Sequence, residues 1–164
     1  MANSSFIGKS KNKIIKAIIK DRDIITAIGS TISVASPEKY IGTHIFDFNR
    51  NPFTLNESIT FITVQVHIPK YADYTGTYVA PTIEIWVVSH ENHMSVDNVP
   101  KVTENRNDYI SELLDKKFNG SSGYGLGKIH LQSNFEGAFQ QDYLYRKLIF
   151  VGEDVNNSFC EEEE

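Results

Sequence analysis

Two runs of alternating residues between Glu57 and Ser89 constrain the fold more than any other part of this sequence. The first run, Ser58–Ile68, and the second, Thr82–Ser89, both alternate aliphatic and other side chains. The aliphatic positions are Ile62, Val64, Val66 and Ile68 in the first run and Ile83, Ile85 and Val87 in the second. A period of two places successive side chains on opposite faces of a strand. The two runs therefore predict two strands, each with one face in a core.

The second run also carries apolar residues at the alternate positions. Trp86 and Val88 lie on the face opposite Ile83, Ile85 and Val87. A strand that is apolar on both faces is typical of a sheet covered on both sides. We therefore expect the second strand to be covered in part on its other face as well.

Isoleucines at helical spacing between Lys11 and Ile28 predict an amphipathic helix. The polar residues Asp21–Asp23 allow a break in this helix. Ser10 is the expected N-cap and Gly29 the expected stop. Lysines flank the isoleucines, so a membrane-surface helix is the alternative interpretation. A helix that covers a sheet is favoured, because an α+β domain needs one.

A second helix is predicted over Arg106–Asn119, where apolar side chains again recur at helical spacing. Asn105 or Asn107 is expected to cap it, and Gly120 to end it. The apolar stripe consists of Tyr109, Ile110, Leu113, Leu114 and Phe118.

Shorter runs predict the remaining strands. Two of them, Thr31–Val34 and His44–Phe48, precede the central pair, and two, Lys128–Gln132 and Gln141–Val151, close the chain. Ser133–Gly137 is expected to form the turn between the last two strands. The fold predicted is α+β: a mainly antiparallel sheet with two helices packed on one face and a long hairpin loop.

The predicted organisation has three parts. Residues 1–10 are expected to be a flexible N-terminus, residues 11–152 a single α+β domain, and residues 153–164 an acidic, disordered tail. A chain of 164 residues with 40% hydrophobic residues suits one domain with a proper core. One cysteine, the absence of signal-peptide features at the N-terminus and the absence of a long apolar run predict a chain made in a reducing cytosol, with no membrane span.

The sequence contains no pattern that predicts catalysis. Gly123, Gly125 and Gly127 resemble a phosphate-binding loop, but they follow a helix and precede a strand, which is the reverse of what such a loop needs. His90 and His93 are three apart in a predicted loop, which favours a solvated polar loop over a metal site. We therefore expect no catalytic residue, no cofactor and no metal. A net charge of −5 without a basic run also argues against specific nucleic-acid binding.

The segment Pro69–Pro81 is the candidate protein interface. It carries Tyr71, Tyr74 and Tyr78 between two prolines and is longer than a minimal hairpin turn. Tyrosine is common at interfaces because its ring is buried while its hydroxyl group forms hydrogen bonds. The alternative is that these three rings cap one edge of the core.

The order of the predicted elements resembles the tail terminator (tail completion, or neck) proteins of long-tailed bacteriophages. The resemblance covers residues 11–152 and rests on an amphipathic helix, a strand, a long hairpin, a strand reading Pro81-Thr-Ile-Glu-Ile-Trp-Val-Val-Ser89, a helix and two closing strands. It implies a structural virion protein without enzymatic activity. Such a protein forms a ring, usually a hexamer, at the head-tail junction.

The resemblance also implies the partners. They are other copies of the same chain, the tail tube protein, and head-closure or connector proteins, with DNA passing through the ring without sequence-specific binding. A closed ring of this kind uses heterologous contacts between neighbours. The alternatives are another phage head-tail connector, a minor tail component, or a soluble binding domain unrelated to phages.

Overall fold

The two strands predicted by alternation form the centre of a five-stranded sheet in the computed structural model, which describes residues 6–52, 57–68, 80–139 and 142–153. β2 (Thr60–His67) and β3 (Thr82–His90) pair antiparallel, with Ile62 opposite Val87 and Val64 opposite Ile85. The aliphatic residues of both strands thus lie on the same face, as their period of two predicts.

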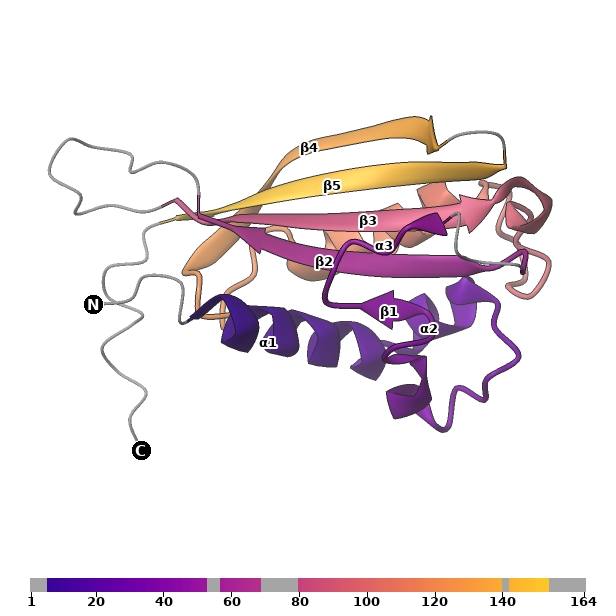
Figure 1. Ribbon diagram of the computed structural model, residues 1–164, viewed down its shortest axis with the longest axis horizontal. Helices are drawn as coiled ribbons and strands as arrows, with labels where there is room; N and C mark the ends of the chain where they lie inside the picture. Colours follow the sequence, from indigo (N-terminus) through magenta and orange to yellow (C-terminus); the bar gives the residue numbers. More distant parts are fainter. Residues whose placement is uncertain (1–5, 53–56, 69–79, 140–141, 154–164) are drawn as a thin grey trace, which may run out of the picture.

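Three further strands extend this pair. β5 (Tyr143–Glu153) pairs antiparallel with β3, and β4 (Lys128–Phe139) pairs antiparallel with β5. β1 (Ile45–Phe46) pairs parallel with β2. The strand order is therefore β1-β2-β3-β5-β4, a mostly antiparallel sheet that confirms the predicted α+β class (Figure 1).

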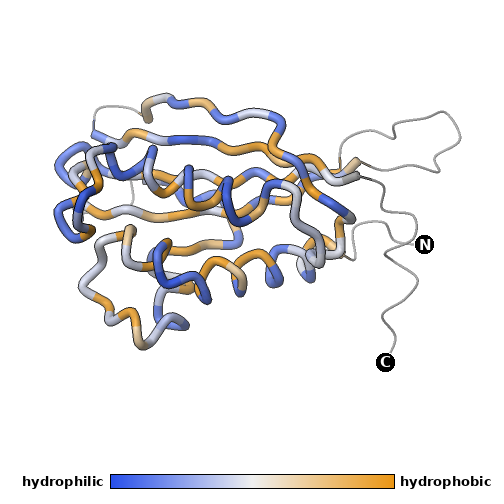
Figure 2. Tube along the Cα trace, turned by 180° about the vertical axis from the view of Figure 1, so that it is seen from behind, coloured by the Kyte–Doolittle hydropathy of each residue, from blue (hydrophilic) through white to orange (hydrophobic). Residues whose placement is uncertain are grey.

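The helices lie on one face of this sheet, as Figure 2 shows from behind. They are α1 (Phe6–Lys20), α2 (Arg22–Ile28) and α3 (Arg106–Phe118). Their apolar stripes and the inner face of the sheet form one core, because neither surface can be buried alone. Its fully buried members include Ile14, Ile18, Ile24, Ile62, Ile85, Ile110, Leu114, Phe118, Leu148 and Phe150.

The break predicted near Asp21 divides the N-terminal helix in two, so the described residues contain three α-helices where two were expected. Asp21 has an extended backbone, and its Oδ1 accepts hydrogen bonds from the N–H groups of Asp23 and Ile24 at 3.2 and 3.3 Å. It is therefore the N-cap of α2. Gly29 ends α2 in the left-handed conformation, with φ of 68°.

The predicted N-terminal boundary is wrong. α1 begins at Phe6 and not at Lys11, so residues 6–10 belong to the domain and not to a flexible terminus. Phe6 and Ser10 are buried, which extends the apolar stripe by one helical turn. Ser10 is accordingly an interior residue of the helix and not its N-cap.

Two other predicted elements also differ. Thr31–Val34 forms bends and a turn, not a strand; Ile32 packs against the core, and its carbonyl accepts a hydrogen bond from the Tyr40 hydroxyl at 2.8 Å. The 3₁₀ helix η1 (Pro37–Tyr40) follows it. His44–Phe48 is a strand only at Ile45–Phe46.

The turn predicted at Ser133–Gly137 is in fact the second half of β4. A β-bulge lies between Leu131 and Ser133, and the pairing with β5 continues to Phe139. Before the bulge Leu131 lies opposite Phe150; after it Asn134 lies opposite Leu148. The extra residue at the bulge shifts the side chains of β4 that face the core from odd-numbered to even-numbered positions. This shift hides the alternation in the sequence.

Candidate functional site

The sheet face opposite the helices carries a second apolar cluster. Residues at alternate positions of β2, β3 and β5 point to this face because the inner positions belong to the core. Its buried members are Phe46, Phe61, Val88 and Tyr143, and Ile59, Trp86, Phe139 and Tyr145 pack against them. The prediction that β3 is partly covered on both faces is therefore confirmed.

Near β1 this outer face is covered by neighbouring side chains. The Phe46 ring lies 5.9 Å from Phe61 and 5.4 Å from Phe48 between ring centroids. The guanidinium of Arg50 lies 5.4 Å from the centroid of Phe46. Residues just after β1 thus return over β2 and close that part of the face.

Toward β4 the same face forms a strip of aromatic side chains around Lys147. We call Trp86, Phe135, Phe139, Tyr145 and Lys147 the outer strip. Trp86 and Phe139 stack at 5.8 Å, and the Tyr145 ring lies 4.8 Å from Trp86 and 4.9 Å from Phe139. Phe135, at the end of the strip, is 43% exposed. No helix of the described residues covers it.

The charge in the outer strip is balanced locally. Lys147 Nζ lies 4.8 Å from the Trp86 ring centroid and 5.7 Å from that of Phe135, a cation–π arrangement. The same Nζ is 2.9 Å from Glu84 Oε2, which also accepts a hydrogen bond from Trp86 Nε1 at 3.2 Å. The strip therefore presents aromatic surface without an unpaired charge, which suits contact with another protein surface.

The outer strip borders an unpaired sheet edge. β4 is the last strand in the order, and no strand of the described residues pairs with its outer side. Such an edge presents backbone N–H and C=O groups that a further strand can bind. Aromatic surface and strand edge together form the candidate protein interface of this molecule.

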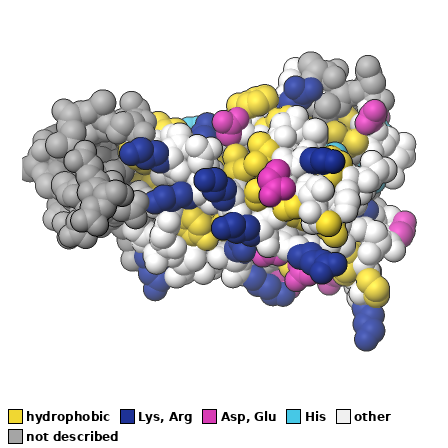
Figure 3. All heavy atoms as spheres, turned by 90° about the horizontal axis from the view of Figure 1, so that it is seen from below, with side chains coloured by type: hydrophobic (Ala, Val, Ile, Leu, Met, Phe, Trp, Pro, Cys, Tyr) yellow, Lys and Arg dark blue, Asp and Glu magenta, His cyan; other side chains and the backbone are white. Residues whose placement is uncertain are grey.

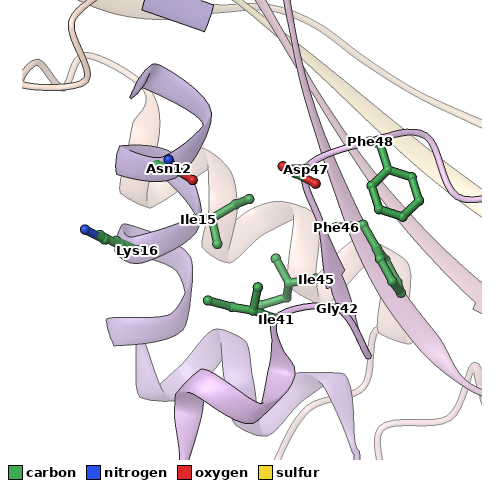
Figure 4. A pocket seen from close by; sticks show the side chains of 9 residues that line it. All are labelled: Asn12, Ile15, Lys16, Ile41, Gly42, Ile45, Phe46, Asp47 and Phe48. Carbon is green, nitrogen blue, oxygen red and sulfur yellow. The ribbon is translucent and has the colours of Figure 1, made fainter. Parts of the chain in front are cut away.

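A small hollow lies between α1 and β1 (Figure 4). Its volume is about 170 Å³, and its apolar lining includes Ile15, Ile41 and Phe48. Lys16 and Asp47 are the charged groups at its rim. Ile41 and Phe48 are 47% and 50% exposed, so this hollow is an apolar dent in the surface and not an enclosed site.

A larger and more polar hollow of about 430 Å³ lies where α3 begins against β4 and β5. Arg146 contacts Asp108 at 2.6 Å and Glu136 at 3.5 Å, and Asn105 Nδ2 donates to Asp108 Oδ2 at 2.8 Å. These charges already satisfy one another. Arg146 therefore pairs with both acidic side chains that line the hollow.

The two histidines that resembled a metal motif have separate roles. His90 Nδ1 accepts a hydrogen bond from the backbone of Asn92 at 3.1 Å. His93 Nδ1 lies 2.8 Å from Thr60 Oγ1. Among the described residues no group of three histidine, cysteine or acidic side chains is placed to hold a metal ion.

His93 begins a buried chain of hydrogen bonds. Thr60 Oγ1 lies 2.7 Å from Ser89 Oγ, Ser89 donates to Asn107 Oδ1 at 2.6 Å, and Asn107 Nδ2 donates to the Leu144 carbonyl at 3.0 Å. Burial lowers the pKa of His93, and the nearby Arg106 guanidinium lowers it further. A hydroxyl beside a neutral histidine resembles a nucleophile–base pair, but Thr60 and Ser89 are fully buried. A substrate cannot reach them, so this chain of hydrogen bonds has a structural role: it joins β2, β3, α3 and β5.

Arg106 fixes the loop between β3 and α3. Its guanidinium is buried and donates to the carbonyl groups of His93, Ala27 and Ser95. The Ala27 carbonyl belongs to the last turn of α2, where a cation also interacts favourably with the helix dipole. A side chain on Gly29 would collide with this guanidinium, so the glycine gives it room.

The structure does not test the interface predicted at Tyr71, Tyr74 and Tyr78, because these residues lie outside the described ranges. The interface that it does reveal, the outer strip, was only partly visible in the sequence. Trp86 was predicted to lie on the second face of its strand, and Tyr145 and Lys147 lie within the predicted strand Gln141–Val151. Phe135 and Phe139 were missed because the bulge in β4 hides their alternation.

Comparisons with known proteins add one match. A sequence model of the YomW family, a phage-derived family, matches residues 11–151, which is most of the chain. No curated protein and no solved structure gives a significant match. None of the described helices is long and apolar enough to cross a membrane.

Proposed function

Because the chain belongs to the phage-derived YomW family, we propose that it is a structural virion protein that forms a ring at the head-tail junction. In this proposal it is a tail terminator: it caps the tail tube, joins the tail to head-closure or connector proteins, and lets DNA pass. It acts through protein contacts and not as an enzyme, and its place is the neck of the virion.

The observation that carries this proposal is the outer strip beside the free edge of β4. A ring needs two different surfaces on each subunit, because each copy contacts its neighbours head to tail. Phe135 is 43% exposed next to stacked rings and a balanced charge pair. An aromatic cluster of this kind favours a protein partner, and truncation of a central aromatic often costs about 2–4 kcal/mol of binding.

The test removes one aromatic side chain of the outer strip and leaves the core intact. Phe135→Ser is expected to fold, because the side chain is 43% exposed and a surface substitution changes stability by about 1 kcal/mol or less. It is expected to weaken self-association at least thirtyfold, which corresponds to about 2 kcal/mol per contact. Analytical ultracentrifugation and electron micrographs of the purified protein, alone and mixed with tails, provide the measurement.

Leu144→Ser is the matched control. Leu144 is 37% exposed but lies on the helix side of β5, away from the outer strip. It is expected to assemble like the unmodified protein. A protein that stays monomeric in the presence of tail tubes would refute the proposal. Rings that bind to heads but not to tails would instead assign the chain to a head-closure protein.

The Tyr-rich loop remains a second predicted contact. Replacing Tyr71, Tyr74 and Tyr78 with serine is expected to spare the fold and to impair ring assembly or tail attachment. Complementation of a phage that lacks the gene measures this effect, with thermal melting as the control for folding. If the variant unfolds, the three rings belong to the core. Full phage yield from a folded variant would exclude the loop as an interface.

A further inference from the structure

One face of α1 carries a straight row of lysines. Lys9, Lys13, Lys16 and Lys20 are spaced i, i+4, i+7 and i+11, which places them within roughly 60° of one another around the helix axis. The row spans about 16 Å. It lies opposite the buried isoleucines of the helix and faces away from the sheet, on the side of the molecule that Figure 3 presents, where basic side chains gather. We call these four residues the lysine row.

Three of the four lysines in the row lack a compensating acid among the described residues. α1 contains no aspartate or glutamate, and among the described residues no carboxylate pairs with Lys9, Lys16 or Lys20, all of which are exposed. The lysines of α3 differ, because Lys117 pairs with Asp21 and Lys116 with Glu112. A concentrated positive charge on a chain of net charge −5 is therefore confined to one helix face.

We propose that the lysine row binds the phosphate backbone of double-stranded DNA without reading its sequence. This inference rests on the proposed ring, which would enclose DNA. The row advances by 4.5–6 Å along the helix axis from one lysine to the next, and a DNA strand carries a charge about every 3.4 Å along its axis. Several lysines can therefore contact phosphates at the same time.

The composition of the row excludes base recognition and favours weak contact. Sequence readout needs side chains that reach base edges, typically arginine, asparagine or glutamine in a groove. The row contains only lysines, whose flexible stems carry point charges. A few such contacts bind weakly at physiological salt, since the affinity falls steeply as salt rises. This weakness is compatible with DNA that must move through a ring.

The test compares two triple variants of the full-length protein. In the first, Lys9, Lys16 and Lys20 are replaced by glutamine. In the second, the matched control, Lys39, Lys101 and Lys128 are replaced; these three are exposed lysines outside α1 and carry the same total charge. Binding to a short labelled duplex of mixed sequence is measured by fluorescence anisotropy from roughly 50 to 200 mM salt.

The unmodified protein is expected to give a slope of log K against log salt of about −2.7 for three phosphate contacts, made by Lys9, Lys16 and Lys20. The row variant is expected to give a slope near zero and at least tenfold weaker binding at the lowest salt, whereas the control stays within twofold. Equal losses in both variants, or no binding by the unmodified protein, would overturn the proposal.

Two other anionic partners are outcomes of the same experiment. A labelled peptide with the sequence of residues 154–164 and vesicles containing anionic lipid are tested in parallel. Row-dependent binding to either one without binding to DNA would assign the row to that partner and refute the DNA assignment. The failures of the two proposals can be told apart: a monomer that binds DNA through α1 would refute only the tail terminator proposal, and a ring without DNA binding would refute only this one.

Discussion

At the scale of single residues, buried polar groups specify how the elements meet. His93, Thr60, Ser89 and Asn107 come from four different places in the sequence and form one continuous chain of hydrogen bonds. A buried polar group without a partner costs about 1–3 kcal/mol. Each member therefore holds the next in one arrangement, and the chain makes the register between helix and sheet specific.

This chain makes stability depend on pH. The pKa of His93 is lowered in the folded protein by burial and then by the Arg106 charge, from an ordinary value near 6.5. At a pH above this ordinary pKa, the imidazole is neutral in both the folded and the unfolded state. Below it the unfolded chain binds a proton first, so the free energy of unfolding falls as the pH falls toward the folded-state pKa. Urea unfolding between about pH 7.5 and 5 is expected to show this decrease.

His93→Asn removes the titrating group while offering Thr60 a polar partner. The variant is expected to lose less stability between about pH 6.5 and 5 than the unmodified protein. Burial also lowers the pKa of His44, which is present in both proteins. Parallel pH profiles for the two proteins would show that His93 does not carry the effect.

At the scale of elements, one aspartate separates α1 from α2. Asp21 caps α2 through Oδ1, and its Oδ2 lies 2.9 Å from Lys117 Nζ of α3. The same carboxylate therefore starts one helix and ties it to another. Local capping and long-range pairing support the same geometry, which is typical of a well-specified fold.

The two roles of Asp21 can be separated by substitution. Asp21→Ala is expected to destabilise the protein by about 1–2 kcal/mol, because it removes the cap and the ion pair. Asp21→Asn keeps a capping oxygen and loses only the charge, so a loss below about 1 kcal/mol is expected. Urea denaturation measures both. If the asparagine variant were as unstable as the alanine variant, the ion pair and not the cap would dominate.

At the scale of the whole molecule, the strand order of the sheet predicts which strands unfold locally most readily. β3 and β5 are paired on both sides, whereas β4 has a free edge and β1 is only two residues long. Hydrogen exchange is therefore expected to be slowest in β3 and β5 and faster in β1 and β4. Uniform protection across the five strands would contradict this order.

The same measurement tests the proposed assembly. If the β4 edge contributes to a ring interface, β4 amides are expected to gain protection when rings form, while β3 and β5 change little. Mass spectrometry of exchanged peptides from monomer and ring fractions provides the comparison. Unchanged β4 protection in intact rings would move the interface away from this edge.

Local sequence signals determined much of the fold. Alternation determined β2 and β3, a helical stripe with an asparagine cap determined α3, and Asp21 marked the break between α1 and α2. Each of these depends on neighbours within a few residues, so it is readable without knowledge of the tertiary structure. The second apolar face of β3 was readable for the same reason.

Tertiary structure decided the rest, because the deciding partners lie far apart in the chain. The burial of Phe6 extended α1 beyond its expected start, and the pairing with β5 carried β4 through a bulge that sequence reasoning took for a turn. The outer strip exists only because that bulge turns Phe135 toward Lys147 and Phe139 toward Trp86 and Tyr145. Likewise, His93 meets Thr60 across 33 residues. No local pattern encodes such contacts, since they form only when the sheet has closed.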